Sequence, residues 1–234
     1  MATEMKTIGL IGGMSWESTV PYYQIINETI SKELGGFHSA KIILYSVDFA
    51  EIEQYQTNGN WSAAGNALGW AAHLLQEAGA DFIVLCTNTM HKVARQMCQY
   101  INVPLLHIAE VTANELNYHR VKKVGLLGTK YTMTQDFYKE KLAEAGIETV
   151  IPDEENIEIV NDVIFNELCK GIISPAAKQK FLRIIERLQA AGAEGVVLGC
   201  TEIGSLIKQK DVKIPVFDTT ILHAQRAAMK ALGK

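Results

Sequence analysis

Two short segments in different halves of the chain have similar sequences, and each ends in a side chain that can take part in chemistry. Residues 78–89 read AGADFIVLCTNT and residues 191–203 read AGAEGVVLGCTEI. Aligned on their first residues, they place Thr87 opposite Cys200. Each has the pattern of a helix end, a glycine, a short buried β-strand and a polar group at the strand's carboxyl end. Ligands bind at that end of open α/β sheets, so Thr87 and Cys200 are candidates for corresponding positions in two half-sites.

The strand period assigns a different role to Cys86, which directly precedes Thr87. Successive side chains of a strand point to opposite faces. If Thr87 points toward a ligand, Cys86 therefore points back into the packed interior.

One reactive group from each half suits a reaction on both faces of a small substrate, such as removal of a proton from one face of a carbon and its return to the other. A thiolate can act as the base if nearby N–H donors lower its pKa, which is about 8.5 for a free thiol. Thr201 and Glu202 follow Cys200 at an expected turn into a helix, which would supply such donors. The alternative is a structural role for Cys200, because free cysteine is among the most buried residue types.

Alternating strands and helices must position these groups. The pattern predicts an α/β fold of two pseudosymmetric αβα lobes, each with a mainly parallel sheet, and an active site in the cleft between them. We expect the first lobe to contain residues 1–102 and 214–234 and the second to contain residues 103–213. The expected strands are 6–11, 41–49, 81–85, 103–108, 122–127, 149–151, 195–198 and 214–219. The first expected helix follows Ser15 or Ser18 and carries Tyr22 to Ile30, and later ones include 61–78, 91–99, 135–145, 157–170 and 176–190.

Composition argues against several other classes of protein. A net charge of −4 over 234 residues gives no basic surface for nucleic acid or an anionic membrane. The chain has no long apolar run and no signal-peptide pattern, so we expect a cytoplasmic protein. Its four cysteines are not spaced like a disulfide framework or a zinc site, so we expect reduced thiols and no metal. The loop at Gly12 and Gly13 lacks the spacing of a dinucleotide or phosphate-binding loop.

Four motifs spread along the chain resemble the aspartate/glutamate racemase family. They are GLIGGMSWEST at 9–19, CTNTMH at 86–91, FNELCKG at 165–171 and GCTEI at 199–203. The match is closest to the bacterial subgroup of L-aspartate/glutamate-specific and broad-specificity amino-acid racemases. The resemblance implies a pyridoxal-phosphate-independent, cofactor-free racemase of aspartate or glutamate, or of a broader range of amino acids, with two pseudosymmetric domains and a homodimeric assembly.

The resemblance also implies a two-base mechanism, with one cysteine directly before Asn-Thr in the first lobe and another in the Gly-Cys-Thr motif of the second. Cys200 occupies the second position, whereas Thr87 stands at the first. We therefore expect Cys200 to deprotonate the L-amino acid. Thr87, or a water that it holds, then delivers a proton on the D-face, and the reverse direction is weak because a hydroxyl is a poor proton acceptor.

Further roles are implied position by position. The resemblance assigns the α-carboxylate and ammonium of the substrate to Asn88, Thr89, Thr201 and Glu202. It places Met14 near the substrate and gives Gln56 and Lys170 substrate contacts, with Lys170 able to pair with a side-chain carboxylate. The alternative for Gln56 and Lys170 is a solvated surface position. We expect His91 and His107 to be structural histidines, and the alternative is that they tune the site.

Two other functions are compatible with a single thiol. One is a related decarboxylase of malonate-type acids or a maleate isomerase. The other is a non-catalytic amino-acid-binding protein in which Thr87 marks a first half-site that has lost its chemistry.

Overall fold

The computed structural model describes residues 4–234, which divide into two compact units. The first contains residues up to His107 together with His223–Lys234, and the second contains Ile108–Leu222. Each unit has a four-stranded sheet whose neighbouring strands run parallel, and the two sheets have corresponding strand orders. The predicted α/β fold with two related parallel sheets is thereby confirmed.

The sheet of the first unit has the order β2-β1-β3-β4. Its strands are β2 (Ile42–Ser46), β1 (Ile8–Gly12), β3 (Phe82–Leu85) and β4 (Leu105–Leu106). The two central strands, β1 and β3, are buried along their whole length. Such continuous apolar runs are typical of parallel strands that are covered on both faces.

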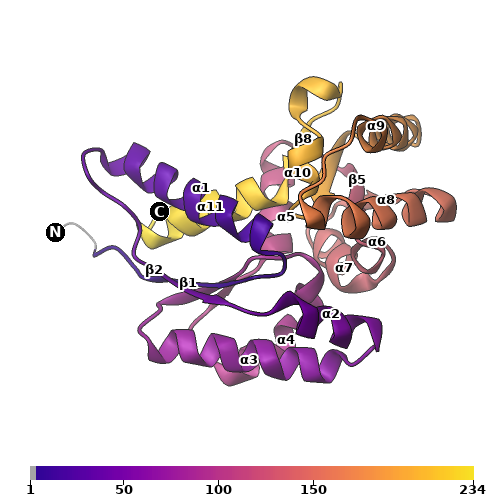
Figure 1. The fold of residues 1–234 in the computed structure, drawn as a ribbon. Helices are drawn as coiled ribbons and strands as arrows, with labels where there is room; N and C mark the ends of the chain where they lie inside the picture. The colour runs from indigo at the N-terminus through magenta and orange to yellow at the C-terminus, as the bar shows by residue number, and fades with distance from the viewer. Residues whose placement is uncertain (1–3) are drawn as a thin grey trace. The chain divides into compact units, whose positions relative to one another are not determined.

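Helices cover both faces of this sheet (Figure 1). On one face, α1 (Trp16–Leu34) packs with α11 (Thr219–Ala231), and Ile26 of α1 shares an apolar cluster with Ala224 and Ala228 of α11. The other face is covered by α3 (Trp61–Glu77). The same side carries α2 (Phe49–Thr57), α4 (Ala94–Met97) and the 3₁₀ helices η1 (Thr89–Val93) and η2 (Cys98–Tyr100).

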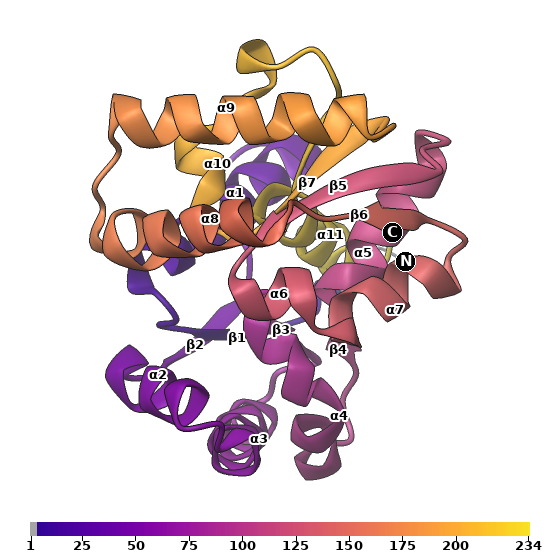
Figure 2. The same cartoon turned by 90° about the vertical axis from the view of Figure 1, so that its right-hand side faces the viewer.

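The sheet of the second unit has the order β6-β5-β7-β8. Its strands are β6 (Glu148–Val150), β5 (Lys123–Gly128), β7 (Gly195–Gly199) and β8 (Val216–Asp218). Figure 2 shows α8 (Glu154–Asn166) and α9 (Pro175–Ala190) on one face of this sheet and α5 (Ile108–Tyr118) and α7 (Asp136–Glu144) on the other. The remaining short helices of this unit are α6 (Lys130–Thr134), η3 (Leu168–Lys170), α10 (Ile203–Leu206) and η4 (Gln209–Asp211).

Local sequence explains why α9 begins and packs where it does. The Ser174 side chain accepts a hydrogen bond from the Ala177 N–H, and Pro175 stands at the first helical position, where its missing N–H costs nothing. Ala177, Phe181, Ile184, Ile185 and Leu188 are buried at helical spacing. Replacement of the fully buried Phe181 by alanine would cost about 3–5 kcal/mol of stability.

The boundaries between the units differ from those predicted. β4 pairs with β3 and so belongs to the first sheet, whereas β8 pairs with β7 and belongs to the second. The predicted division at 102/103 and 213/214 assigned both strands to the wrong lobe, because each last strand joins its own sheet before the chain crosses over. The sequence patterns also missed α2 and α5, and the helix predicted at 91–99 is instead the run of short helices η1, α4 and η2. Among residues 4–234, no helix is both long enough and apolar enough to cross a membrane.

Candidate functional site

Cys200 follows β7 directly, at the carboxyl end of a strand that is entirely buried. β5 and β7 approach closely at this edge because Gly128 pairs with Gly199. A Cβ atom at Gly128 would lie 2.7 Å from the Gly199 carbonyl oxygen, so the position cannot take a side chain without moving the backbone. The strand therefore delivers Cys200 to the edge of the sheet in a fixed place, with 8% of its surface exposed.

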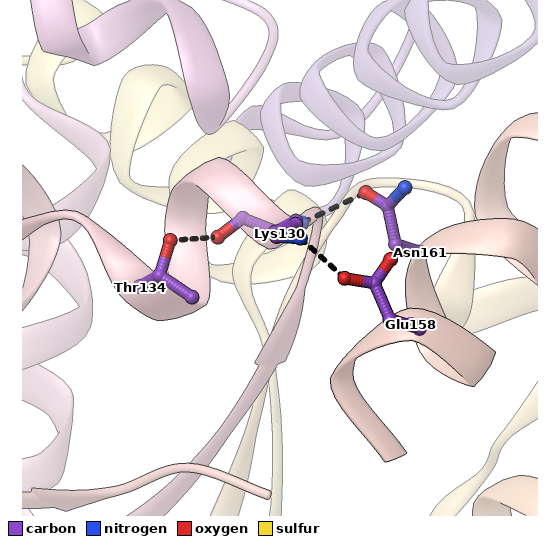
Figure 3. Close-up of polar contacts among 4 residues, drawn as sticks. All are labelled: Lys130, Thr134, Glu158 and Asn161. Atoms are coloured by element: carbon purple, nitrogen blue, oxygen red, sulfur yellow. Dashed lines mark hydrogen bonds and ion pairs between the residues drawn. The ribbon is translucent and has the colours of Figure 1, made fainter. Parts of the chain in front are cut away.

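The short helix α6 begins just after β5, at the same edge of the sheet, and its first residue is tied to α8 (Figure 3). The backbone N–H of Lys130 donates to Asn161 Oδ1 at 2.8 Å, and the Lys130 ammonium forms an ion pair with Glu158. Thr134 Oγ1 donates to the Lys130 carbonyl oxygen at 2.7 Å. These contacts hold α6 against α8 at the carboxyl end of β5.

A buried carboxylate collects hydrogen bonds beside Cys200. The thiol of Cys200 donates to Glu202 Oε2 at 2.9 Å, and Thr201 Oγ1 donates to the same oxygen at 2.7 Å. Cys169 Sγ donates to Glu202 Oε1 at a longer 3.7 Å. Glu202 is 7% exposed, so these donors replace much of the water that a carboxylate would otherwise bind.

This environment raises the pKa of Cys200 well above its usual value. Burial is the largest cause, followed by the negative charge of Glu202. The backbone N–H of Glu202 does donate to Cys200 and acts in the opposite direction, but it does not compensate. The turn after Cys200 thus supplies the expected N–H donor, but the net shift of the Cys200 pKa is upward, and the thiol donates a hydrogen bond to Glu202.

Lys170 ends the 3₁₀ helix η3, and Gly171 follows it in the left-handed conformation. Its side chain is exposed, as the surface alternative for this residue predicted. The neighbouring Cys169 reaches Glu202, so η3 lies beside the Cys200 edge of the second sheet. Sequence patterns gave no sign of this role for Cys169, because nothing local relates it to Glu202.

In the first unit, Thr87 follows β3 by two positions and is buried, as are Asn88 and Thr89 at the start of η1. Its backbone N–H donates to the Leu85 carbonyl oxygen at 2.9 Å, which turns the chain away from the sheet. Cys86 packs in the apolar cluster that contains Tyr22, where burial raises the pKa of its thiol far above the usual range. The side-chain period of the strand predicted this inward orientation.

Met14 and Gln56 lie on the same side of the first sheet as η1. Met14 is buried in the apolar cluster that also contains Met90 of η1. Gln56 is buried too, and its Nε2 donates to Met90 Sδ at 2.9 Å. The surface alternative for Gln56 is therefore wrong, because α2 turns this side chain inward toward η1.

Among residues 4–234, no three or more His, Cys, Asp or Glu side chains are arranged so that they could hold a metal ion.

Comparison with known proteins identifies the family. A sequence model of the Asp/Glu/hydantoin racemases matches residues 11–227. A crystal structure from Yersinia pestis, of a protein provisionally assigned to the Asp/Glu racemases, is 53% identical and has a TM-score of 0.91, covering 97% of this chain and 100% of its own. An aspartate racemase homologue from Pyrococcus horikoshii OT3 is 39% identical with a TM-score of 0.83, covering 97% of this chain and 99% of its own. The broad-specificity amino-acid racemase RacX of Bacillus subtilis is 25% identical over 93% of this chain and 95% of its own. Racemases are isomerases, and the chain belongs to the Asp/Glu/hydantoin racemase family.

Proposed function

We propose that the protein is a cofactor-independent amino-acid racemase that acts on L-aspartate and L-glutamate. Cys200 removes the Cα proton of the L-enantiomer, and Thr87, or a water that it holds, returns a proton on the opposite face. The observation that carries this proposal is the hydrogen bond from the buried Cys200 thiol to Glu202. Membership of the racemase family and the names of the aspartate racemase homologue and RacX support it.

The Cys200–Glu202 pair explains how a buried thiol becomes a base. The thiol must lose its own proton before it can accept one from Cα, and Glu202 Oε2 already accepts that hydrogen bond. Transfer of the proton from Sγ to Oε2 leaves a thiolate beside a neutral carboxylic acid, so the total charge of the pair does not change. The thiolate then takes the Cα proton and leaves a carbanion that is stabilised as the enolate of the substrate carboxylate. Glu202, expected from the resemblance to contact the substrate, thereby serves as the proton acceptor of Cys200.

Thr87 makes the second half of the reaction slow. A free thiol has a pKa of about 8.5, and an alkyl hydroxyl is far less acidic, so Thr87 neither gives up nor accepts a proton easily. L- and D-enantiomers have equal free energies, so kcat/KM for inversion must be the same in both directions. A poor acid–base group at Thr87 therefore cannot make D-to-L inversion slower than L-to-D inversion. Its effect appears instead as exchange of the Cα proton of the L-enantiomer without inversion.

Deuterium exchange in heavy water tests this proposal directly. L-Aspartate or L-glutamate should lose its Cα proton to solvent through Cys200 and regain a deuteron on the same face many times before it inverts. The D-enantiomer should exchange no faster than it inverts, because its exchange requires Thr87. Cys200→Ser should abolish both processes. Absence of Cα exchange with every aspartate and glutamate enantiomer would rule the proposal out.

The same experiment separates the alternatives. A decarboxylase of malonate-type acids releases carbon dioxide from its own substrate and leaves the Cα–H of amino acids intact. A non-catalytic amino-acid-binding protein shifts the melting temperature with ligand but exchanges no proton.

Substrate binding completes the proposal. Asn88, Thr89 and Thr201 bind the α-carboxylate and ammonium, and Met14 and Gln56 line the site from the first unit. Lys170 pairs with the side-chain carboxylate of the substrate. Its exposed ammonium, next to Cys169, supports this role because it remains available for an anionic partner.

We extend the proposal to a homodimer formed through α1. Trp16, Val20 and Tyr23 are 65%, 55% and 59% exposed and recur at the spacing of one helical face. An exposed apolar stripe of this kind is typical of an interaction surface. Light scattering should give the mass of a dimer for the native chain and of a monomer for Val20→Asp, whereas a native monomer would refute the assembly without touching the chemistry.

A further inference from the structure

Three imidazole rings lie together in the first unit, next to the turn that carries Thr87. The ring of His91 lies 4.5 Å from that of His107 and 6.0 Å from that of His223, measured between centroids, in edge-to-face arrangements. They come from η1, from the residue after β4 and from α11. His91 and His223 are buried.

The hydrogen bonds of His223 fix its protonation pattern. Its Nε2 lies 2.9 Å from the Leu106 carbonyl oxygen, which can only accept, so Nε2 carries the proton. In the neutral ring Nδ1 is then an acceptor, and the Tyr22 hydroxyl donates to it at 2.9 Å. The ring is thus held from β4 on one side and from α1 on the other.

His91 makes the contact that reaches the candidate site. Its Nδ1 lies 2.7 Å from the Thr87 carbonyl oxygen, so this nitrogen carries the proton and donates. The backbone N–H of His91 donates to the Asn88 carbonyl oxygen at 3.1 Å, and the Thr87 N–H bonds back to Leu85. The backbone of Thr87 is therefore held through both its N–H and its carbonyl oxygen, and the ring of His91 makes the bond to the carbonyl.

The surroundings keep His91 neutral. Burial lowers the pKa of His91 well below its usual value, and the neighbouring His107 and His223 lower it further. Its hydrogen bonds to the backbone of Thr87 and Asn88 act in the opposite direction but are smaller effects. At neutral pH the ring of His91 is therefore uncharged and carries one N–H donor, which suits a residue that holds the backbone in place.

We propose that His91 is a positioning residue for Thr87: its Nδ1–H holds the Thr87 carbonyl, and the packing of His91 on His107 and His223 fixes the ring that makes this bond. The inference rests on the proposed function, because Thr87 matters only if it completes the reaction. The sequence-based expectation that His91 is merely structural is refined accordingly. The hydrogen bond of His91 is made to Thr87, the residue that supplies the second proton in the proposed reaction.

Substitutions that keep or move one nitrogen test this role. Asparagine places its side-chain nitrogen where Nδ1 lies and keeps the donor, whereas glutamine places it near the position of Nε2 and leucine removes it. The three variants are therefore His91→Asn, His91→Gln and His91→Leu, with the exposed His38→Leu as the matched control.

The enzymatic measurement is the ratio of Cα exchange with retention to inversion for L-aspartate or L-glutamate in heavy water. Exchange with retention needs only Cys200, whereas inversion also needs Thr87. His91→Leu and His91→Gln should raise the ratio about tenfold, and His91→Asn should keep it near the native value. A variant that merely destabilises the protein lowers both rates together. An unchanged ratio in His91→Leu, or a raised ratio in His91→Asn, would overturn the proposal.

A second measurement does not depend on racemase activity. Backbone amide exchange of the peptide covering residues 87–91 should become about tenfold faster in His91→Leu and stay native in His91→Asn. If no amino acid shows Cα exchange, the proposed function fails, and this measurement still decides whether His91 holds the turn. Native amide protection in His91→Leu would show that it does not.

Discussion

The thiol of Cys200 and the carboxylate of Glu202 are joined by a hydrogen bond of 2.9 Å although both side chains are buried. Burial is the largest cause of the raised pKa of Cys200, and the negative charge of Glu202 is the next largest. Cys200 Sγ is the donor in this contact, and Glu202 Oε2 accepts. In the proposed mechanism, this contact is the route by which the thiol passes its proton to Glu202 and becomes a thiolate.

Replacing Glu202 with glutamine should separate the reactivity of the thiol from its use in catalysis. Glutamine accepts a hydrogen bond through its oxygen but cannot take a proton, so Cα exchange should fall at least 100-fold. Loss of the negative charge should also lower the pKa of Cys200, because that charge now raises it. Alkylation of Cys200 by iodoacetamide, followed by peptide mass spectrometry, should begin at lower pH in Glu202→Gln than in the native protein. The exposed Glu186→Gln should change neither quantity, and full activity in Glu202→Gln would show that Glu202 is not the acceptor.

A thiol at position 87 should speed the slow half of the reaction. Thr87→Cys supplies a group with a pKa of about 8.5 in place of an alcohol, so inversion should rise at least tenfold. The D-enantiomer should then exchange its Cα proton before it inverts, as the L-enantiomer does. Thr87→Ser retains a hydroxyl and should show no gain. Equal inversion rates in the cysteine and serine variants would argue against a role for this position on the D-face.

Removal of the Lys170 charge should weaken binding of acidic substrates selectively. In Lys170→Met, KM for L-aspartate and L-glutamate should rise about tenfold, because an ion pair with the side-chain carboxylate is lost. KM for L-alanine, where measurable, should stay unchanged. The exposed Lys180→Met provides the matched control. A parallel rise in KM for acidic and neutral amino acids would assign Lys170 to another role.

Acid should destabilise the first unit through its buried histidines. Burial lowers the pKa of His223 to about 4, below its usual 6.5, so the folded state resists protonation while the unfolded chain accepts it. The contribution of His223 to the free energy of unfolding is fully present above pH 6.5. It falls by about 3 kcal/mol as the pH drops toward 4. Melting temperatures measured between pH 4 and 7 should fall less steeply in His223→Gln, which does not titrate, than in the native protein. Identical slopes would show that His223 is not a source of acid sensitivity.

Sequence alone predicted the positions of Thr87, Cys86 and Cys200 because strand periodicity and the internal repeat are local properties. The repeat aligned the two strand ends, and the period of two turned Cys86 inward. These inferences needed no knowledge of which elements meet.

The partners of these residues could not be predicted in the same way. Cys169 reaches Glu202 from η3, and His223 reaches His91 from α11, so each contact joins elements far apart in the chain. The direction of the Cys200 pKa shift depends on such contacts. A motif places a thiol at a strand end, but burial and one carboxylate decide whether it is charged.

The helix α11, which covers one face of the first sheet, comes after almost the whole of the second unit in the chain. α11 covers β1 and β3 with Ala224, Ala227 and Ala228, and Lys6 near the start of the chain donates its N–H to the Ala231 carbonyl oxygen at 2.9 Å. During synthesis the second unit is made before α11 can cover the apolar face of the first sheet. The first unit therefore completes its fold after the second, although most of its residues are made earlier. The apolar face of the first sheet therefore stays exposed during synthesis until α11 has been made, and the unit that carries Thr87 is open to aggregation for that time.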